Sequence, residues 1–201
     1  MSLGVKRIET SEELYNLFSM RYKVFVDEFD YFQPSEEKLF YDHYDTYPST
    51  MNFIAIDDKT VIGGARVTQS TTAGMPIDKF MNCRKYLPDD AEKIGCGSML
   101  CLEKNYRGKP HLMLFLFGMG YYWAVSRNIT HMLMGAIPPL KDIYSRMGYR
   151  AVSEPVPDKK GLVSVPLIPM ITDVRHPDKK LLNFVNKHLG KDYCLEQVAP
   201  R

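Results

Sequence analysis

The alternation of hydrophobic and polar positions is clearest in the middle of the chain. Residues 99–102 form an apolar run typical of a buried strand, and a basic turn follows it. The next apolar positions recur at the spacing of one helix face: Leu112, Phe115, Leu116, Met119 and Trp123. The sequence therefore predicts a strand, a turn and a helix in succession over residues 99–125.

Upstream, Thr10 and Glu13 have the spacing of a capping box, so we expect a helix to begin at residue 11. Arg21 falls among the apolar positions of this helix, where a cation needs a buried partner or a cleft. Residues 29–47 follow without periodicity, and they include seven aromatic residues. That content argues against disorder and predicts a loop that folds over another part of the molecule.

The remaining pattern alternates strands with short helices. A hairpin of residues 52–57 and 60–68 carries Gly63 and Gly64, which indicate a bulge or a close backbone approach. Further elements are expected in this order: a helix at 76–86, a strand at 129–135, a helix at 139–147 ended by Gly148, strands from Tyr149 and at 162–168, and a helix at 177–189. Together they predict one α/β domain with a mixed sheet over residues 1–201.

Composition excludes several classes of protein. The chain is 45% hydrophobic and 25% charged with a net charge of +2, which is typical of a globular protein and gives no support for nucleic-acid binding. The charge-free apolar run at 112–125 is too short to span a bilayer. Four cysteines without a CxxC spacing predict reduced thiols in a cytoplasmic protein. Five histidines show no metal-binding spacing, so no metal is expected.

The basic turn after the central strand has the sequence Tyr106-Arg107-Gly108-Lys109. Free N–H groups and the positive end of the helix dipole make such a helix start suitable for an anion. An ordinary turn with a solvated Arg and Lys has the same pattern, so this stretch alone leaves both interpretations open.

Two segments resemble the GNAT acyltransferase superfamily. Residues 106–109 are similar to its pantetheine-pyrophosphate loop. Residues 136–149 are similar to a later segment, in which Tyr144 stands at the position where many members have their general acid. The resemblance implies a central mixed sheet flanked by helices. It also implies a donor site at Cys101, Leu102, Arg107, Gly108 and Lys109 for acyl-CoA or the acyl-phosphopantetheine of acyl carrier protein, with no permanently bound cofactor.

The N-terminal half resembles acyl-homoserine-lactone synthases and the related N-acyl amino acid synthases. Arg21, Phe25, Tyr31, Asp42 and Asp45 match the pattern R-x3-F-x5-W-x10-D-x2-D, with Tyr31 in place of Trp. Arg66 and Phe80 continue the pattern with one residue deleted. The resemblance covers roughly residues 14–150 and implies transfer of a long acyl group to a small amine.

Three departures from these patterns are present. Pro110 and Leu112 stand where the GNAT loop has glycines, and the prolines at 138–139 occupy the place of an Asn. Cys96 and Met99 replace the Glu and Arg of the E-x-x-R motif that helps bind the homoserine-lactone precursor. This last departure argues against a homoserine-lactone product.

The resemblance implies a role for each candidate residue. Tyr144 would protonate the leaving thiolate, and Asp42 and Asp45 would hold the ammonium of the acceptor. Water or a carboxylate, Asp45 or Glu103, would serve as the base. Arg21 and Arg66 would clamp a carboxylate of the acceptor, and the apolar helix at 112–125 would line an acyl tunnel together with Phe80. Alternatively, Arg21–Asp45 and Arg66–Asp42 are structural ion pairs, and Tyr144 and the helix at 112–125 are ordinary core.

A basic set in the sequence is a candidate docking surface for acyl carrier protein: Arg84, Lys85, Lys104, Arg107 and Lys109. A solvated basic rim is the alternative. The sequence thus predicts an N-acyltransferase that uses acyl carrier protein or acyl-CoA and a small amine, with an amino acid as a candidate acceptor. Two other functions stay open, an acetyl-CoA-dependent acetyltransferase and a non-catalytic acyl-binding sensor.

Overall fold

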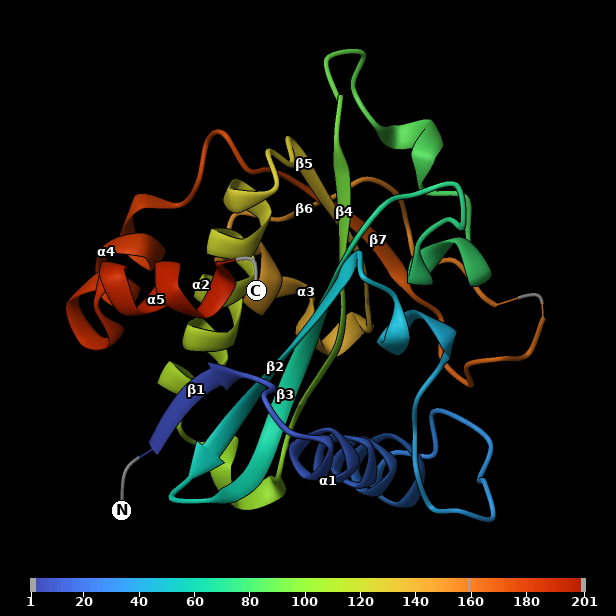
Figure 1. Cartoon of the computed structure of the whole chain (residues 1–201). Coiled ribbons are helices and arrows are strands. Elements are labelled where there is room, and N and C mark those ends of the chain that lie inside the picture. The colour runs from blue at the N-terminus through green and yellow to red at the C-terminus, as the bar shows by residue number, and fades with distance from the viewer. Residues whose placement is uncertain (1–2, 159, 200–201) are drawn as a thin grey trace.

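The computed structural model describes residues 3–158 and 160–199, which build one seven-stranded sheet of order β1-β2-β3-β4-β5-β7-β6 (Figure 1). Its strands are β1 Leu3–Arg7, β2 Thr50–Asp57, β3 Thr60–Gln69, β4 Ile94–Leu102, β5 His131–Ala136, β6 Arg150–Ala151 and β7 Ile168–Asp173. The β4–β5 pair is parallel, whereas the other neighbours are antiparallel. The predicted mixed sheet with flanking helices is confirmed.

The sheet opens between β4 and β5. Their parallel pairing ends at Cys96 and Leu133, although β4 continues to Leu102 and β5 to Ala136. In β4, two residues lie opposite the single residue Ala65 of β3, and the first of them, Met99, has a φ of 55°. This β-bulge bends the strand and leaves one residue outside the regular ladder. Among the described residues, positions 97–102 of β4 therefore have no pairing partner in β5.

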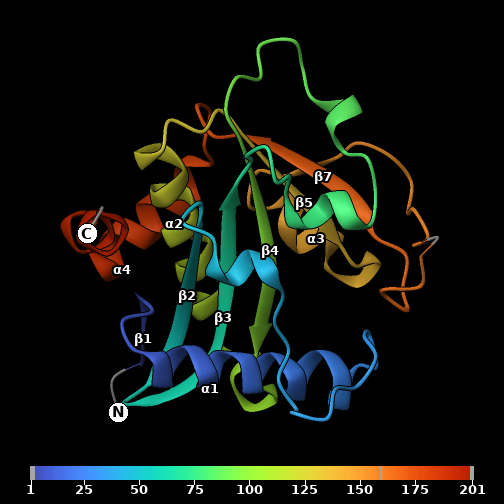
Figure 2. The same cartoon turned by 45° about the vertical axis from the view of Figure 1, so that its right-hand side comes forward.

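The first helix crosses one face of the sheet (Figure 2). The helix α1, Ser11–Tyr22, begins with the predicted capping box, in which Glu13 N donates to Thr10 Oγ1 at 3.1 Å. It continues as a π-helical segment, η1 Lys23–Glu28. A Cβ placed on Gly64 would lie 2.6 Å from Leu17 Cδ1 and 2.5 Å from the carbonyl oxygen of Phe53. The close backbone approach predicted at this glycine is confirmed.

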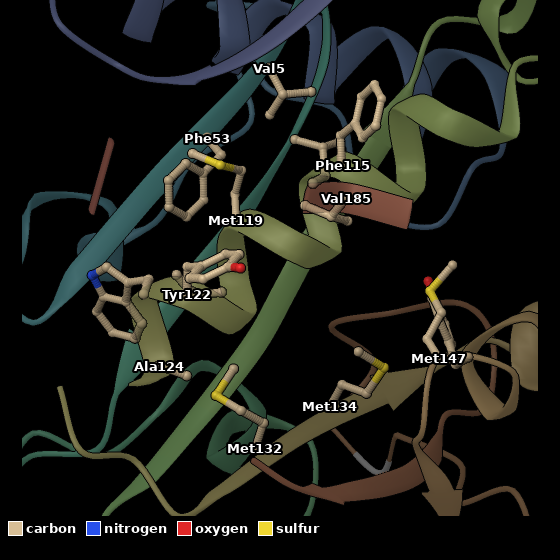
Figure 3. Packing of buried hydrophobic residues seen from close by; sticks show 14 of the residues in the cluster. Val5, Phe53, Phe115, Met119, Tyr122, Ala124, Met132, Met134, Met147 and Val185 are labelled. Carbon is tan, nitrogen blue, oxygen red and sulfur yellow. The ribbon is translucent and has the colours of Figure 1, made fainter. Parts of the chain in front are cut away.

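The second helix, α2 Pro110–Ser126, covers the opposite face, and α4 Lys179–Leu189 and α5 Lys191–Val198 pack against it. Figure 3 shows Met119 of α2 beside Phe53 of β2, and Phe115 beside Val185 of α4. Because α2 lies between the sheet and these two helices, it is apolar on nearly all sides. This explains why its sequence is a continuous hydrophobic run.

Several predicted elements differ from the observed ones. β1, β7 and α5 were not predicted, and residues 162–165 are bends rather than a strand, with Leu167 in a single bridge to Val156. Residues 76–86 contain two short turns, η3 Pro76–Lys79 and η4 Arg84–Tyr86, instead of one helix. The helix expected at 139–147 is the shorter α3, Lys141–Ser145, preceded by η6 Pro138–Leu140. An alternation of apolar and polar residues does not show which residues pair with a neighbouring strand. The strand predicted at 162–168 is therefore replaced by β7, which begins at Ile168.

The four cysteines are free and buried. Among the residues that the structure describes, none of the helices has the length and apolar content required to cross a bilayer.

Candidate functional site

A cavity of about 620 Å³ occupies the opening between β4 and β5. Phe25, Phe32 and Phe80 line it on the side of α1, and Leu116, Phe117 and Tyr121 line it on the side of α2. The cavity therefore reaches both faces of the sheet through the gap between the two strands. Its volume lies within the range of small-molecule sites, about 300–1,000 Å³. The lining is mostly apolar, with a few polar side chains placed at separate points.

Four charged residues form an ion-pair cage beside the cavity. Asp45 accepts from Arg21 Nη1 and from Arg66 Nη1, each at 2.8 Å, and Asp42 accepts from Arg66 Nη1 at 2.7 Å. Both arginines are fully buried. The two acids are brought together by the short turn η2, His43–Thr46, in which Asp42 and Asp45 form a capping box. The Arg21–Asp45 and Arg66–Asp42 pairs predicted as an alternative are both present.

The cage exposes one carboxylate to the cavity. Asp45 has both oxygens occupied and a side chain that is 1% exposed, and it does not line the cavity, nor does Arg21. Asp42 lines the cavity and also binds Lys79 Nζ at 2.8 Å. Burial alone would raise the pKa of Asp42, but the charge of Arg66 and hydrogen bonds from Arg66 and Lys79 lower it to about 2. Asp42 is therefore ionised at neutral pH.

The aromatic loop at residues 29–47, predicted to fold over another part of the molecule, lies over the cavity. Its residues Phe29, Tyr31 and Phe32 line the cavity, as do Phe25 before the loop and Phe80 after it. Tyr31 N donates to the Phe25 carbonyl at 2.8 Å, and the Tyr31 carbonyl accepts from Ser164 N at 2.9 Å. Phe25 packs edge-on against Phe40, with ring centroids 5.8 Å apart. These contacts anchor the loop at its start and connect it to the segment before β7.

The predicted donor residues occupy the end of β4 and the start of α2. Cys101, Leu102, Arg107 and Lys109 line the cavity, whereas Gly108 does not, and a Cβ placed on Gly108 would meet no atom within 4 Å. The structure thus shows no close backbone approach at this glycine. Burial raises the pKa of Cys101 to about 11, so its thiol is neutral.

Arg107 has a partner that the sequence did not indicate. Its Nη2 donates to Glu28 Oε2 at 2.7 Å, its Nη1 donates to the other oxygen of the same carboxylate, and its Nε donates to the Leu102 carbonyl at 3.0 Å. The guanidinium also lies 4.8 Å from the centre of the Phe29 ring. Arg107 therefore connects the π-helical segment η1 to the loop after β4.

Of the two remaining catalytic candidates, only Tyr144 lines the cavity. Glu103 lies outside the cavity wall, and its carboxylate accepts from Lys23 Nζ at 2.6 Å. Tyr144 is buried beside Phe117, and none of the described residues is a hydrogen-bond partner of its hydroxyl. Burial, and then the nearby Tyr31, raise the pKa of Tyr144, so its hydroxyl stays protonated.

Sequence reasoning missed several polar residues of the cavity wall, among them Ser98 and Tyr149. Ser98 accepts from Arg66 Nε at 3.1 Å and so connects the cage to β4. Tyr149 lines the cavity directly after Gly148, whose φ of 88° reverses the chain behind α3. The one sequence signal that could have identified Tyr149 is its position directly after Gly148, where the helix was predicted to end. Among the described residues, no three His, Cys, Asp or Glu side chains are grouped as metal ligands.

The basic set divides into two groups. Arg84 and Lys85 lie in η4 before the start of β4, where Arg84 binds Asp78 at 3.1 Å, whereas Lys104, Arg107 and Lys109 follow the end of this strand. The strand β4 has nine residues, and the intervals between them, at about 3.3 Å each, separate the two groups by roughly 26 Å. Only the second group lies beside the cavity.

The sequence and the fold were compared with those of known proteins. The family model described as N-acyl amino acid synthase FeeM matches residues 16–173. The structure of FeeM, an N-acyl amino acid synthase from uncultured soil microbes, superposes with a TM-score of 0.73 at 14% identity, over 87% of this chain and 92% of that chain. No protein of curated function matches the sequence.

Two further solved structures share the fold. BjaI, a CoA-dependent acyl-homoserine lactone synthase solved with SAM and isopentyl-CoA, has a TM-score of 0.74 at 17% identity, covering 98% of this chain and 95% of its own. ElaA of Escherichia coli has a TM-score of 0.60 at 16% identity, covering 86% of this chain and 99% of its own. At these identities the likeness shows the GNAT-like acyltransferase fold.

Proposed function

The chain belongs to the FeeM family of N-acyl amino acid synthases, N-acyltransferases that act on the amine of an amino acid, and we propose that it uses a long-chain acyl thioester as donor. The cavity through the open β4–β5 pair is the observation that carries this proposal. A thioester placed in the gap has one face toward α2 and the other toward the ion-pair cage. Donor and acceptor can then meet from opposite faces of the sheet.

The size and lining of the cavity favour a long acyl chain over an acetyl group. Phe115 and Met119, the bulky residues of α2 that would plug a tunnel, pack in the core and do not line the cavity. Their neighbours Gly120 and Leu116 line it instead. An apolar chain buried there gains about 0.8 kcal/mol for each CH₂ removed from water. An acetyl group would leave most of the cavity unfilled.

On the acceptor side, Asp42 is the group that meets the amine. Because its pKa is about 2, Asp42 is a weak base and binds the ammonium of the amino acid rather than removing its proton. Water, or a group of the bound substrates, takes the first proton. Arg66 binds Asp42 directly, and Asp45, which is paired with Arg21, accepts from Asp42 N at 3.0 Å, which makes Asp45 a positioning residue in this proposal.

The transfer itself needs one proton donor at the sulfur. The neutral amine attacks the thioester carbon, the C–N bond forms, and the carbonyl electrons move onto oxygen. When the C–S bond breaks, the oxyanion re-forms the carbonyl and Tyr144 gives its hydroxyl proton to the leaving thiolate. The nitrogen loses its extra proton to water, which returns a proton to Tyr144, so the charges balance. Burial keeps Tyr144 protonated until that step.

Acyl-CoA and the acyl-phosphopantetheine of acyl carrier protein present the same thioester to the cavity. Discrimination between these two donors therefore depends on contacts outside the cavity. Lys104, Arg107 and Lys109 form the basic group at the donor end. We propose that this group contacts the phosphates or acidic side chains of the carrier. Reversing the charge of Lys104 and Lys109 should raise the KM for acyl carrier protein several-fold, and an unchanged KM would refute this contact.

The function is tested by thiol release from acetyl-CoA, palmitoyl-CoA and long-chain acyl carrier protein, each offered with a pool of amino acids. We expect release with the long donors only, together with an N-acylated amino acid in the product. Tyr144→Phe should lower kcat without preventing donor binding. Release with acetyl-CoA alone would identify an acetyltransferase. Donor binding without any release would identify an acyl-binding protein that lacks turnover.

A further inference from the structure

A second tyrosine hydroxyl lies at the point where β4 and β5 separate. Gly97 is the first β4 residue beyond the last parallel pair, Cys96 with Leu133. A Cβ placed on Gly97 would lie 3.9 Å from the hydroxyl oxygen of Tyr149. Tyr149 lines the cavity and is 8% exposed. The hydroxyl therefore reaches the gap in which the proposed function places the thioester.

This hydroxyl has no structural partner. None of the described residues forms a hydrogen bond with it, and the ring alone makes the packing contact with Phe117, at 6.0 Å between centroids. A phenylalanine would make the same contact, so the packing of the ring does not require the hydroxyl, which opens to the cavity. Burial raises the pKa of Tyr149, so the group remains a donor over the working range of pH. An unpaired donor facing a cavity is suited to an acceptor atom of a ligand.

We propose that Tyr149 donates a hydrogen bond to the carbonyl oxygen of the thioester and stabilises the oxyanion of the tetrahedral intermediate. This assignment rests on the proposed acyl transfer. As the amine attacks, the C–N bond forms and the π electrons of the carbonyl move onto the oxygen that Tyr149 faces. Tyr149 keeps its proton throughout, whereas Tyr144 gives its proton to the sulfur when the C–S bond breaks. The two tyrosines on either side of Gly148 thus divide the two developing charges.

The assignment predicts different behaviour for the two tyrosines. Tyr149→Phe should lower kcat by about 10²-fold or more, the loss typical of one oxyanion donor, with less than a twofold change in donor KM. An aryl thioester of the same acyl chain separates the roles, because its thiolate leaves without a proton. Tyr144→Phe should regain most of its activity with the aryl thioester, whereas Tyr149→Phe should remain impaired.

A second variant tests the geometry without touching the tyrosine. The Cβ of Gly97→Ala would lie 3.5 Å from Met134 Cε and 3.9 Å from the Tyr149 hydroxyl, which are ordinary contacts, so the protein should fold. The added methyl group would cover the hydroxyl, and kcat should fall as in Tyr149→Phe. Tyr22→Phe is the matched control, because Tyr22 is a buried tyrosine of α1 away from the cavity, and its kcat should be unchanged.

Two results would overturn the assignment while the proposed function stands. One is a Tyr149→Phe variant with the kcat of an active wild-type enzyme. The other is a defect that disappears with the aryl thioester, which would place Tyr149 at the sulfur. A wild-type protein that releases no thiol from any donor would refute the proposed function, and this assignment with it.

Discussion

Replacement of Asp45 by Asn tests whether the ion-pair cage stabilises the wall of the cavity. The carboxylate of Asp45 lies between Arg21 and Arg66 and is 1% exposed. Asparagine has nearly the same shape but no charge. The substitution therefore removes the electrostatic partner while leaving the packing almost unchanged.

The expected loss follows from what each arginine retains. Among the described residues, Asp45 is the carboxylate that pairs with Arg21, which would keep one neutral contact, Asn52 Oδ1 at 2.6 Å. Arg66 would keep Asp42. Removal of one partner from a buried pair costs about 3–5 kcal/mol, because the remaining charge stays buried without compensation. That is a large part of the total stability of a domain, about 5–15 kcal/mol.

The control is Asp42→Asn. The side chain of Asp42 is 18% exposed, and its loss leaves Arg66 paired with Asp45, so about 1.5–3 kcal/mol should be lost. Urea unfolding of the wild type and both variants, followed by circular dichroism, gives the free energies of unfolding. A loss below about 1 kcal/mol for Asp45→Asn, or one no larger than for Asp42→Asn, would refute the argument that Asp45 compensates two buried charges.

Three further predictions concern acid stability, helix packing and the loop after β4. Because the pKa of Asp42 falls from 3.8 in the unfolded chain to about 2 in the fold, its stabilisation is complete above 3.8 and is lost as the pH decreases toward 2; Tm should drop over that range, and less so in Asp42→Asn. Gly118→Ala should lower the free energy of unfolding by about 1–3 kcal/mol, because its Cβ would lie 2.6 Å from Val185 Cγ2, and adding Val185→Ala should restore most of it in urea unfolding. Glu28→Gln should release Arg107 for a donor phosphate and lower the KM for acyl-CoA several-fold, whereas an increased KM would show that the ion pair itself shapes the donor site.

The local elements were predictable because their signals lie within a few residues. The two hydrogen bonds of the capping box join Thr10 and Glu13, which are three positions apart. Gly64 indicates a close approach of neighbouring chain segments because it has no side chain. The family was also readable from the sequence, since the spacing of Arg21, Asp42 and Asp45 is a linear pattern. The roles of these residues as ammonium ligand, clamp or base stay predictions.

Contacts between distant segments were not predictable from such patterns. Arg107 in its turn resembles an anion-binding residue, but Glu28, 79 positions earlier, takes both of its terminal nitrogens. Similarly, no local sequence pattern predicts that Tyr149 lies near Gly97. Their proximity depends on the angle at which β4 diverges from β5. The strand β7 was missed because its neighbour β5 lies more than thirty residues earlier.

The sequence by itself determined the fold class, the acyltransferase family and the residues of the ion-pair cage, because short-range periodicity and fixed spacing encode them. The tertiary structure decided which of those residues reach the cavity: Asp42 does and Asp45 does not, although they are three positions apart. It also decided that the sheet opens beyond Cys96 and that two tyrosines, Tyr144 and Tyr149, line the cavity there. These features depend on strand divergence and side-chain burial, which arise only when segments far apart in the chain pack together.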